Sequence, residues 1–85
     1  MSDATLEQIR RFLAENYLFT DDPNVLGLDD SLLGRGIVDS TGMLEVILFI
    51  EEQWGIKVAD QDMVPENLDS VSRIAAYVES RRKSR

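Results

Sequence analysis

One serine of this chain, Ser40, has the setting that chemistry at a hydroxyl group requires. It follows the glycine-rich segment Gly34-Arg35-Gly36-Ile37-Val38-Asp39 and stands at the predicted start of a helix. A helix start presents backbone N–H groups without partners and the positive end of the helix dipole, so it favours a phosphate group. Ser40 is therefore a candidate site for a phosphodiester, although a simple helix cap at Asp39 or Ser40 also explains the pair.

Gly42 favours the interpretation of Ser40 as a phosphodiester site over its interpretation as a helix cap. It falls in the first turn of the predicted helix, where glycine costs up to about 1 kcal/mol relative to alanine. A glycine at such a place allows another group to approach the backbone closely. We therefore expect something to lie against Gly42.

The predicted helix after Ser40 is more apolar than one buried face requires. Seven of the eight residues 43–50 are apolar, which predicts that Leu44 and Leu48 point to solvent. Exposed apolar residues beside acids are typical of a docking surface, and the acids at its charged rim are Glu45, Glu51 and Glu52. The alternative is a helix packed on two sides, with all seven apolar residues buried.

The inventory of side chains excludes several kinds of chemistry. The 85 residues predict one domain, residues 1–85, and contain neither cysteine nor histidine. Disulfides, thiolate metal sites, and Ser-His-Asp and Cys-His catalysis are therefore excluded.

The charge is strongly negative and unevenly distributed. The net charge is −7, with thirteen acids against two bases between residues 12 and 72 and a basic tail at residues 80–85. The acidic part would repel nucleic acid and anionic lipid, so we expect proteins with basic patches as partners and no nucleic-acid or membrane contact. Solubility is the simpler reason for such a charge. The sequence shows neither a signal peptide nor a transmembrane run, so we expect a cytoplasmic protein.

Helical periodicity dominates the chain. A first helix is predicted from about Asp3 to Leu18, and its buried face consists of Leu6, Ile9, Leu13 and Tyr17. A second is predicted from Asp39 or Ser40 to Trp54, ended by Gly55. The last opens at Asp69-Ser70, and its buried face consists of Val71, Ile74, Ala75 and Val78.

The connections complete an all-α prediction. Residues 20–38 form a long loop with turn residues at 21–24 and with apolar residues expected to pack down, namely Leu26, Leu28, Leu32, Leu33, Ile37 and Val38. A brief helical turn is predicted at Asp60 to Met63, stopped by Val64-Pro65. We therefore expect a small bundle of three main helices and one short helix.

The stretch from about Leu32 to Val78 resembles acyl carrier proteins and peptidyl carrier domains. The matching features are Leu-Leu-Gly ahead of Asp-Ser, the apolar helix with Glu51-Glu52, and Trp54-Gly55-Ile56 at its end. The run Pro65-Glu66-Asn67-Leu68-Asp69-Ser70-Val71, preceded by Asp60-x-Asp62, is similar to the third-helix region of free-standing carriers.

This resemblance implies a four-helix bundle in which Ser40 bears 4′-phosphopantetheine, with Asp39, Thr41 and Gly42 around it. A separate phosphopantetheinyl transferase would move the arm from coenzyme A to the Ser40 hydroxyl with Mg²⁺. The thiol of the arm would hold an acyl or aminoacyl group as a thioester, loaded by a ligase and used by transferases or synthases. A chain without cysteine would thus take part in thiol chemistry as a monomeric carrier and not as an enzyme.

The resemblance also assigns contacts to single positions. The family positions that contact the transferase and client enzymes correspond to Asp39, Leu44, Glu45, Leu48, Glu51 and Glu52. Ile56 corresponds to a family position that closes one side of the arm and its cargo. Fatty-acid carriers usually read Asp-Ser-Leu, whereas Thr41 follows Ser40 here. This favours a dedicated carrier in a secondary pathway, or an aminoacyl or peptidyl carrier served by an amino-acid-activating ligase. An unmodified acidic helical adaptor is the alternative from another class.

Two further motifs are weaker candidates. Asp69-Ser70 repeats the dipeptide of Ser40 but lacks the glycine-rich approach, so helix capping explains it. Asp60-x-Asp62 has the spacing of a calcium loop, but Pro65 occupies the position that requires glycine. We therefore predict no metal site.

Overall fold

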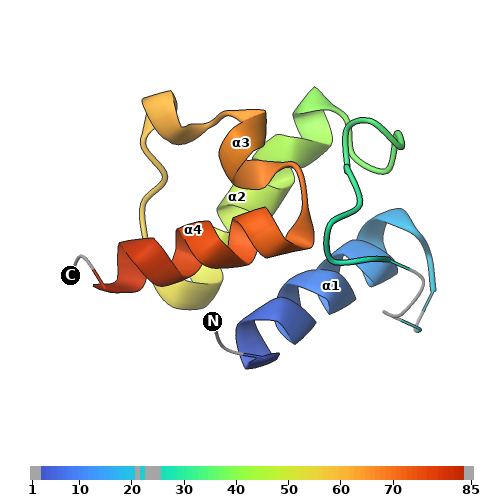
Figure 1. Ribbon diagram of the computed structural model, residues 1–85, viewed down its shortest axis with the longest axis horizontal. Coiled ribbons are helices and arrows are strands. Elements are labelled where there is room, and N and C mark those ends of the chain that lie inside the picture. The colour runs from blue at the N-terminus through green and yellow to red at the C-terminus, as the bar shows by residue number, and fades with distance from the viewer. Residues whose placement is uncertain (1–2, 21, 23–25, 84–85) are drawn as a thin grey trace.

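The first helix places its predicted apolar stripe in the core. The computed structural model describes residues 3–20, 22 and 26–83, and α1 spans Asp3–Tyr17 (Figure 1). Ile9 and Leu13 are fully buried, and Tyr17 packs against the core while partly exposed. The spacing of three and four residues thus predicted the buried face correctly, and the helix ends one residue before Leu18.

The second helix, α2, spans Ser40–Trp54, and its two ends have local causes. Asp39 is the N-cap, because its carboxylate accepts a hydrogen bond from the Gly42 N–H at 2.7 Å. Gly55 ends the helix in the left-handed conformation, with φ of 64°, which glycine adopts without steric cost. Of the two residues that could cap the helix, Asp39 does so, and Ser40 is the first helical residue.

The second half of the chain contains a short helix that the resemblance placed in the run around Pro65 but that periodicity did not predict. After the short 3-10 helix η2 (Asp60–Asp62), helix α3 spans Pro65–Leu68 and α4 spans Val71–Lys83. Pro65 was expected only to stop the preceding turn. It also opens α3, because proline has a helical φ and the first helical residue needs no N–H partner.

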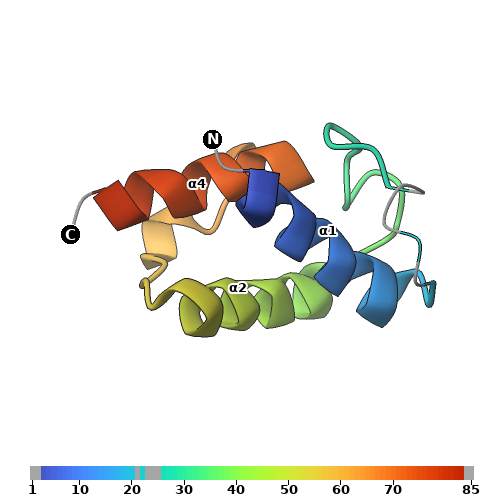
Figure 2. The same ribbon diagram turned by 90° about the horizontal axis from the view of Figure 1, so that it is seen from below.

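The helices form one bundle around a shared core. Helix α4 packs against both α1 and α3, and α1 crosses obliquely between α2 and α4 in Figure 2. Every α-helix and the long loop contribute buried side chains, including Leu13, Leu32, Ile50, Leu68 and Ile74. No β-strand occurs in residues 3–20, 22 and 26–83. The predicted all-α four-helix bundle of acyl-carrier type is confirmed.

Five of the six apolar residues that were expected to pack down from the loop between α1 and α2 do so. Leu26, Leu32 and Val38 are buried as expected, and Leu28 and Ile37 pack against the core. Leu33 was expected to pack down as well, but it is 38% exposed. The predicted turn residues Asp21, Pro23 and Asn24 lie outside the described residues.

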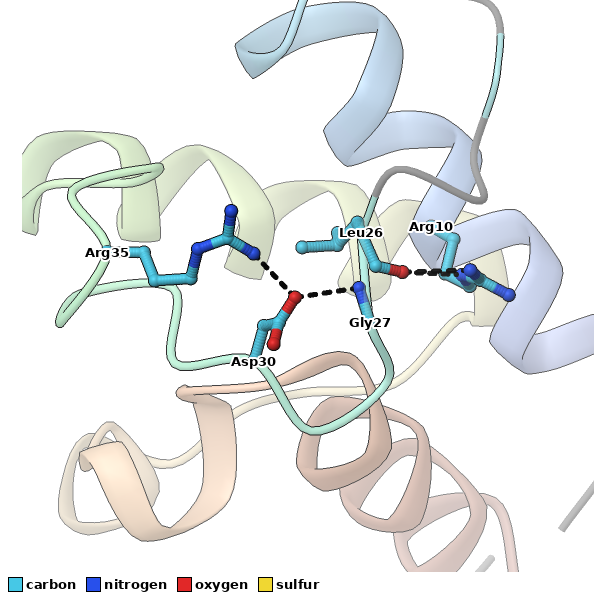
Figure 3. Close-up of polar contacts among 5 residues, drawn as sticks. All are labelled: Arg10, Leu26, Gly27, Asp30 and Arg35. Carbon is cyan, nitrogen blue, oxygen red and sulfur yellow. Dashed lines mark hydrogen bonds and ion pairs between the residues drawn. The ribbon is translucent and has the colours of Figure 1, made fainter.

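Polar contacts hold the middle of this loop in place (Figure 3). The Arg10 guanidinium of α1 donates two hydrogen bonds to the Leu26 carbonyl, at 2.8 and 3.1 Å. The Asp30 carboxylate accepts from the Gly27 N–H at 2.8 Å and pairs with Arg35. These contacts fix Leu26 against α1 and hold the turn between Gly27 and Arg35 together.

Candidate functional site

Ser40 lies on the surface at the first position of α2. Both Asp39 and Ser40 are exposed, and none of the described residues forms a hydrogen bond with the Ser40 hydroxyl. The Asp39 carboxylate accepts a hydrogen bond from the Gly42 N–H. The backbone N–H groups of the residues before Gly42 have no acceptor within the helix. A phosphate group on Ser40 would lie at the positive end of the α2 dipole, which suits it electrostatically. Thr41 is exposed beside Ser40.

The group that approaches Gly42 belongs to the protein itself. A Cβ atom added at this buried glycine would lie 2.9 Å from Val38 Cγ1 and 3.2 Å from Tyr17 Cε1. The Tyr17 hydroxyl donates to the Gly42 carbonyl at 3.1 Å. Gly42 therefore lets the end of α1 pack against the start of α2, and the close approach expected at this glycine is made by Val38 and Tyr17.

Tyr17 links Gly42 to the acidic surroundings of the site. Burial raises the pKa of Tyr17 above its ordinary value of 10.0, and the nearby Glu45 carboxylate raises it further, followed by Asp39. Two negative charges near the tyrosine ring disfavour a third, so the hydroxyl stays protonated and remains a donor. The start of α2 is therefore held by a neutral tyrosine at neutral pH.

An apolar pocket of about 270 Å³ adjoins Ser40. Ser40 is the one polar side chain of its lining, which otherwise consists of Leu33, Met43, Leu44, Ile47, Met63, Val64, Pro65 and Leu68. Sequence reasoning did not predict this pocket. The available signal was the apolar run 63–65 after an acidic turn, together with a leucine next to Gly34 in the loop, but their proximity depends on the tertiary fold.

Asp69 fixes the position of Leu33, which lines this pocket. Its carboxylate accepts from the Ser31 hydroxyl at 2.6 Å and from the Leu33 N–H at 2.9 Å, and its carbonyl accepts from the Leu32 N–H at 2.8 Å. These three bonds tie the loop ahead of α2 to the junction of α3 and α4. Asp69 is thus a structural residue that sequence reasoning treated only as part of a helix cap.

Ser70, the serine of the Asp-Ser pair before α4, is inaccessible. It is 3% exposed, and its hydroxyl accepts from the Arg73 N–H at 3.2 Å at the start of α4. The predicted capping role is confirmed.

The residues expected at a docking surface fall into two groups. Leu44 and Leu48 are exposed by 56% and 57%, as predicted, and Glu45 and Glu52 are also exposed. Glu51 is half-buried, and its carboxylate accepts from the Val58 N–H at 3.0 Å, so it fixes the chain after α2.

Ile56 lies apart from the exposed residues of α2. It is 6% exposed, belongs to the core and does not line the pocket beside Ser40. The structure therefore brings Ser40, Asp39, Leu44 and Glu45 to one end of the exposed side of α2, and it keeps Ile56 inside.

Two other kinds of site find no support in the described part of the chain. No group of three His, Cys, Asp or Glu side chains there could hold a metal ion. Asp62, of the pair with calcium-loop spacing, accepts a hydrogen bond from the Tyr77 hydroxyl at 2.9 Å. Over the same residues, the helices are too short or too polar to cross a bilayer.

The structure is an all-helical bundle of the acyl-carrier type, with Ser40 exposed at the start of α2. No family model matches the chain. A D-alanyl carrier protein of Abiotrophia defectiva is 33% identical to it over 75 residues, which cover 88% of this chain and 92% of the relative. The chain belongs to the free-standing phosphopantetheine carriers of the acyl-carrier type.

Proposed function

We propose that Ser40 is the residue that bears the phosphopantetheine arm and that the protein presents an aminoacyl or acyl thioester on it to partner enzymes. The observation that carries this proposal is the contrast between the Asp-Ser pair before α2 and the one before α4. Ser40 is exposed at the head of α2 beside an apolar pocket, whereas Ser70 is 3% exposed and bonded as a cap. The protein itself performs no catalysis in this proposal.

The attachment step is a phosphoryl transfer with coenzyme A as the donor. The Ser40 hydroxyl oxygen forms a bond to phosphorus and gives up its proton, while the diphosphate bond of coenzyme A breaks and its nucleotide bisphosphate leaves. A separate transferase and Mg²⁺ supply the catalysis. The chain supplies the nucleophile, held by the Asp39 cap and by the packing of Tyr17 on Gly42. When bound, the arm supplies a thiol that this chain lacks.

The preferred cargo is an aminoacyl group. The relative from Abiotrophia defectiva is named a D-alanyl carrier protein, and Thr41 replaces the leucine that is usual after Asp-Ser in fatty-acid carriers. An amino-acid-activating ligase would then load the arm, and a downstream transferase would remove the amino acid.

An apolar acyl group is the second candidate, and the pocket favours it. Apart from Ser40, its lining contains no polar side chain and therefore no carboxylate to pair with an ammonium group. Loading the protein with a hexanoyl and, separately, an alanyl thioester distinguishes the two. If the pocket takes the cargo, the hexanoyl form alone shifts the NMR methyl signals of Met43 and Met63. Equal spectra for the two forms would remove the support for the acyl candidate.

Attachment is tested by intact-mass measurement after incubation with a broad-specificity phosphopantetheinyl transferase, coenzyme A and Mg²⁺. The protein should gain the mass of one arm, Ser40→Ala should gain nothing, and Ser70→Ala should still gain it. Peptide mapping of the modified wild-type protein locates the arm even where Ser70→Ala folds poorly. An unmodified adaptor would gain no mass, and an arm on any other residue would overturn the proposal.

Docking is proposed to use the exposed side of α2, with Leu44 and Leu48 flanked by Asp39, Glu45 and Glu52. We expect Glu45→Lys to slow arm transfer up to about tenfold at low ionic strength, because complementary charges mainly accelerate encounter. Glu66→Lys makes the same charge change at an exposed residue of α3 and is the matched control. Equal rates for the two variants would contradict an α2 docking surface.

A further inference from the structure

Phe19, just after the end of α1, has the most exposed large apolar side chain among the described residues. It is 86% exposed and does not belong to the core. The other exposed large apolar residues line the pocket beside Ser40 or lie on α2, and they are Leu33, Leu44, Leu48 and Met63. Single exposed apolar residues are common on protein surfaces. Exposure by itself therefore assigns no role to Phe19.

The backbone of Phe19 provides a second, independent observation. Its φ is 53°, the one positive φ of a non-glycine residue in the described part of the chain. In this left-handed region the Cβ atom of an L-residue lies too close to the following carbonyl oxygen. Glycine has no Cβ and is the usual residue there, whereas a bulky side chain is an outlier. The backbone at Phe19 is therefore strained.

The end of α1 requires a left-handed residue at this position. The Leu18 N–H donates to the Leu13 carbonyl at 3.2 Å. The Thr20 N–H donates to the Ala14 carbonyl at 3.1 Å. Phe19 lies between these two donors, and its positive φ turns the chain back toward carbonyls that have no acceptor role within the helix. Glycine would make the same turn without strain, so the phenyl ring serves neither the turn nor the core.

Phe19 lies close in the chain to a contact that leads to Ser40. Tyr17, two residues before Phe19, donates to the carbonyl of Gly42, which is two residues after Ser40. In Figures 1 and 2 the end of α1 and the start of α2 lie toward the same end of the bundle. Two residues span at most about 7 Å, and one side of a standard protein interface covers about 800 Å². An enzyme that covers Ser40 therefore has room to cover Phe19 as well.

The enzyme that attaches the arm fits this place better than those that act later. Its active site must reach the Ser40 hydroxyl itself, whereas later enzymes meet the thiol at the far end of a flexible arm. An exposed aromatic ring gains most from burial in an apolar pocket of a partner. The exposed acid Asp22 disfavours anionic lipid and nucleic acid as the partner. We propose that Phe19 is a recognition residue that inserts into an apolar pocket of the phosphopantetheinyl transferase, an inference that rests on the proposed attachment at Ser40.

The test compares three replacements of Phe19 by measuring kcat/KM for arm transfer to Ser40. Phe19→Asn removes the ring but keeps a residue that tolerates the left-handed conformation. Phe19→Gly removes both the ring and the strain, and Phe19→Tyr keeps an aromatic ring. We expect Phe19→Asn and Phe19→Gly to lower kcat/KM about tenfold, and Phe19→Tyr to stay within about twofold of the wild type.

Urea unfolding of the same variants excludes damage to the fold. We expect Phe19→Gly to raise the midpoint by about 0.5 M, because it relieves the strained backbone. A variant that is more stable and yet a poorer substrate has lost a contact with the enzyme. The loss at Phe19→Asn should also persist at high ionic strength, because salt screens charges and not apolar burial. The effect of Glu45→Lys should fade under the same conditions.

Several results would overturn the role of Phe19. Equal kcat/KM for the wild type, Phe19→Asn and Phe19→Gly would show that the ring makes no contact with the transferase. A loss in Phe19→Gly alone would assign the effect to a more flexible chain. Vesicle binding or self-association that Phe19→Asn abolishes, with arm transfer unchanged, would assign the ring to a lipid surface or a second copy. A wild-type protein that gains no arm would refute the attachment at Ser40 and this inference with it.

Discussion

Of the three Asp-Ser dipeptides in the chain, Asp39-Ser40 and Asp69-Ser70 each stand at the start of an α-helix, and these two copies have opposite surroundings. At Asp39-Ser40 both residues are exposed, and the aspartate caps its own helix through the Gly42 N–H. At Asp69-Ser70 the serine is buried and caps α4, while the aspartate is bonded to Ser31 and Leu33 of a distant loop. The first copy leaves its hydroxyl exposed to solvent, and the second bonds segments of the fold together.

The difference teaches that the roles of aspartate and serine are exchanged between the two copies. Where aspartate is the cap, serine becomes the first helical residue and its hydroxyl remains available. Where serine is the cap, its hydroxyl is used inside the fold, and aspartate is released to bind another segment. Asp39 thus makes Ser40 accessible, and Asp69 shapes the wall of the pocket next to Ser40 by holding Leu33.

The largest expected effect comes from removing the two aspartates one at a time. Asp69→Ala leaves the Ser31 hydroxyl and the Leu33 N–H without their acceptor, so we expect the free energy of unfolding to fall by about 2–3 kcal/mol. Asp39→Ala removes a single cap bond and should cost about 1 kcal/mol. Urea unfolding of both variants measures the difference. Equal losses would show that the loop bonds of Asp69 contribute nothing.

A smaller effect is expected at Gly42, which only the first copy possesses. Alanine would gain about 1 kcal/mol in helix propensity, but its Cβ would meet buried Val38 at 2.9 Å, and overpacking costs about 1–3 kcal/mol. We expect Gly42→Ala to lower the free energy of unfolding by about 1 kcal/mol. Thr41→Ala, at the exposed neighbouring residue, is the control and should stay within about 0.5 kcal/mol. A more stable Gly42→Ala protein would refute the close contact with Val38.

The smallest effect concerns Tyr17, whose pKa is raised by burial, then by Glu45, then by Asp39. Because the folded pKa exceeds 10.0, the unfolded chain loses the tyrosine proton first, and this contribution to stability is full below pH 10 and lost as pH rises through the folded pKa. Asp39→Asn should lower the pKa of Tyr17 slightly, and Asp69→Asn should leave it unchanged. An NMR titration of the ring signals at alkaline pH measures both. A change in the Tyr17 pKa caused by Asp69→Asn and not by Asp39→Asn would contradict the influence of Asp39 on Tyr17.

The elements of the fold follow closely from local sequence signals. The apolar residues of α1 recur at helical spacing, Asp39 stands where a cap is needed, and Gly55 stands where α2 must end. Each signal acts within a few residues and could be recognised without knowledge of the rest of the chain. Periodicity did not predict α3, because this helix has only four residues and its opening proline also signals the end of a preceding element. Only the resemblance pointed to a third helix in this region.

The candidate site was predictable in part. The sequence identified Ser40 and the exposed pair Leu44 and Leu48, because a helix with too many apolar residues cannot bury them all. It misjudged Leu33, whose exposure depends on bonds to Asp69, 36 residues away. It also placed Glu51 on the acidic rim, although the carboxylate bonds to the chain after α2.

The sequence by itself determined the helices, their ends, the acidic charge and the serine at the head of α2, because capping, periodicity and composition act over short distances. Only the tertiary structure decided which Asp-Ser pair faces solvent, where the apolar pocket lies and which side of α2 faces α1. Burial and exposure depend on which distant segments pack together, and two identical dipeptides carry no local information that distinguishes them.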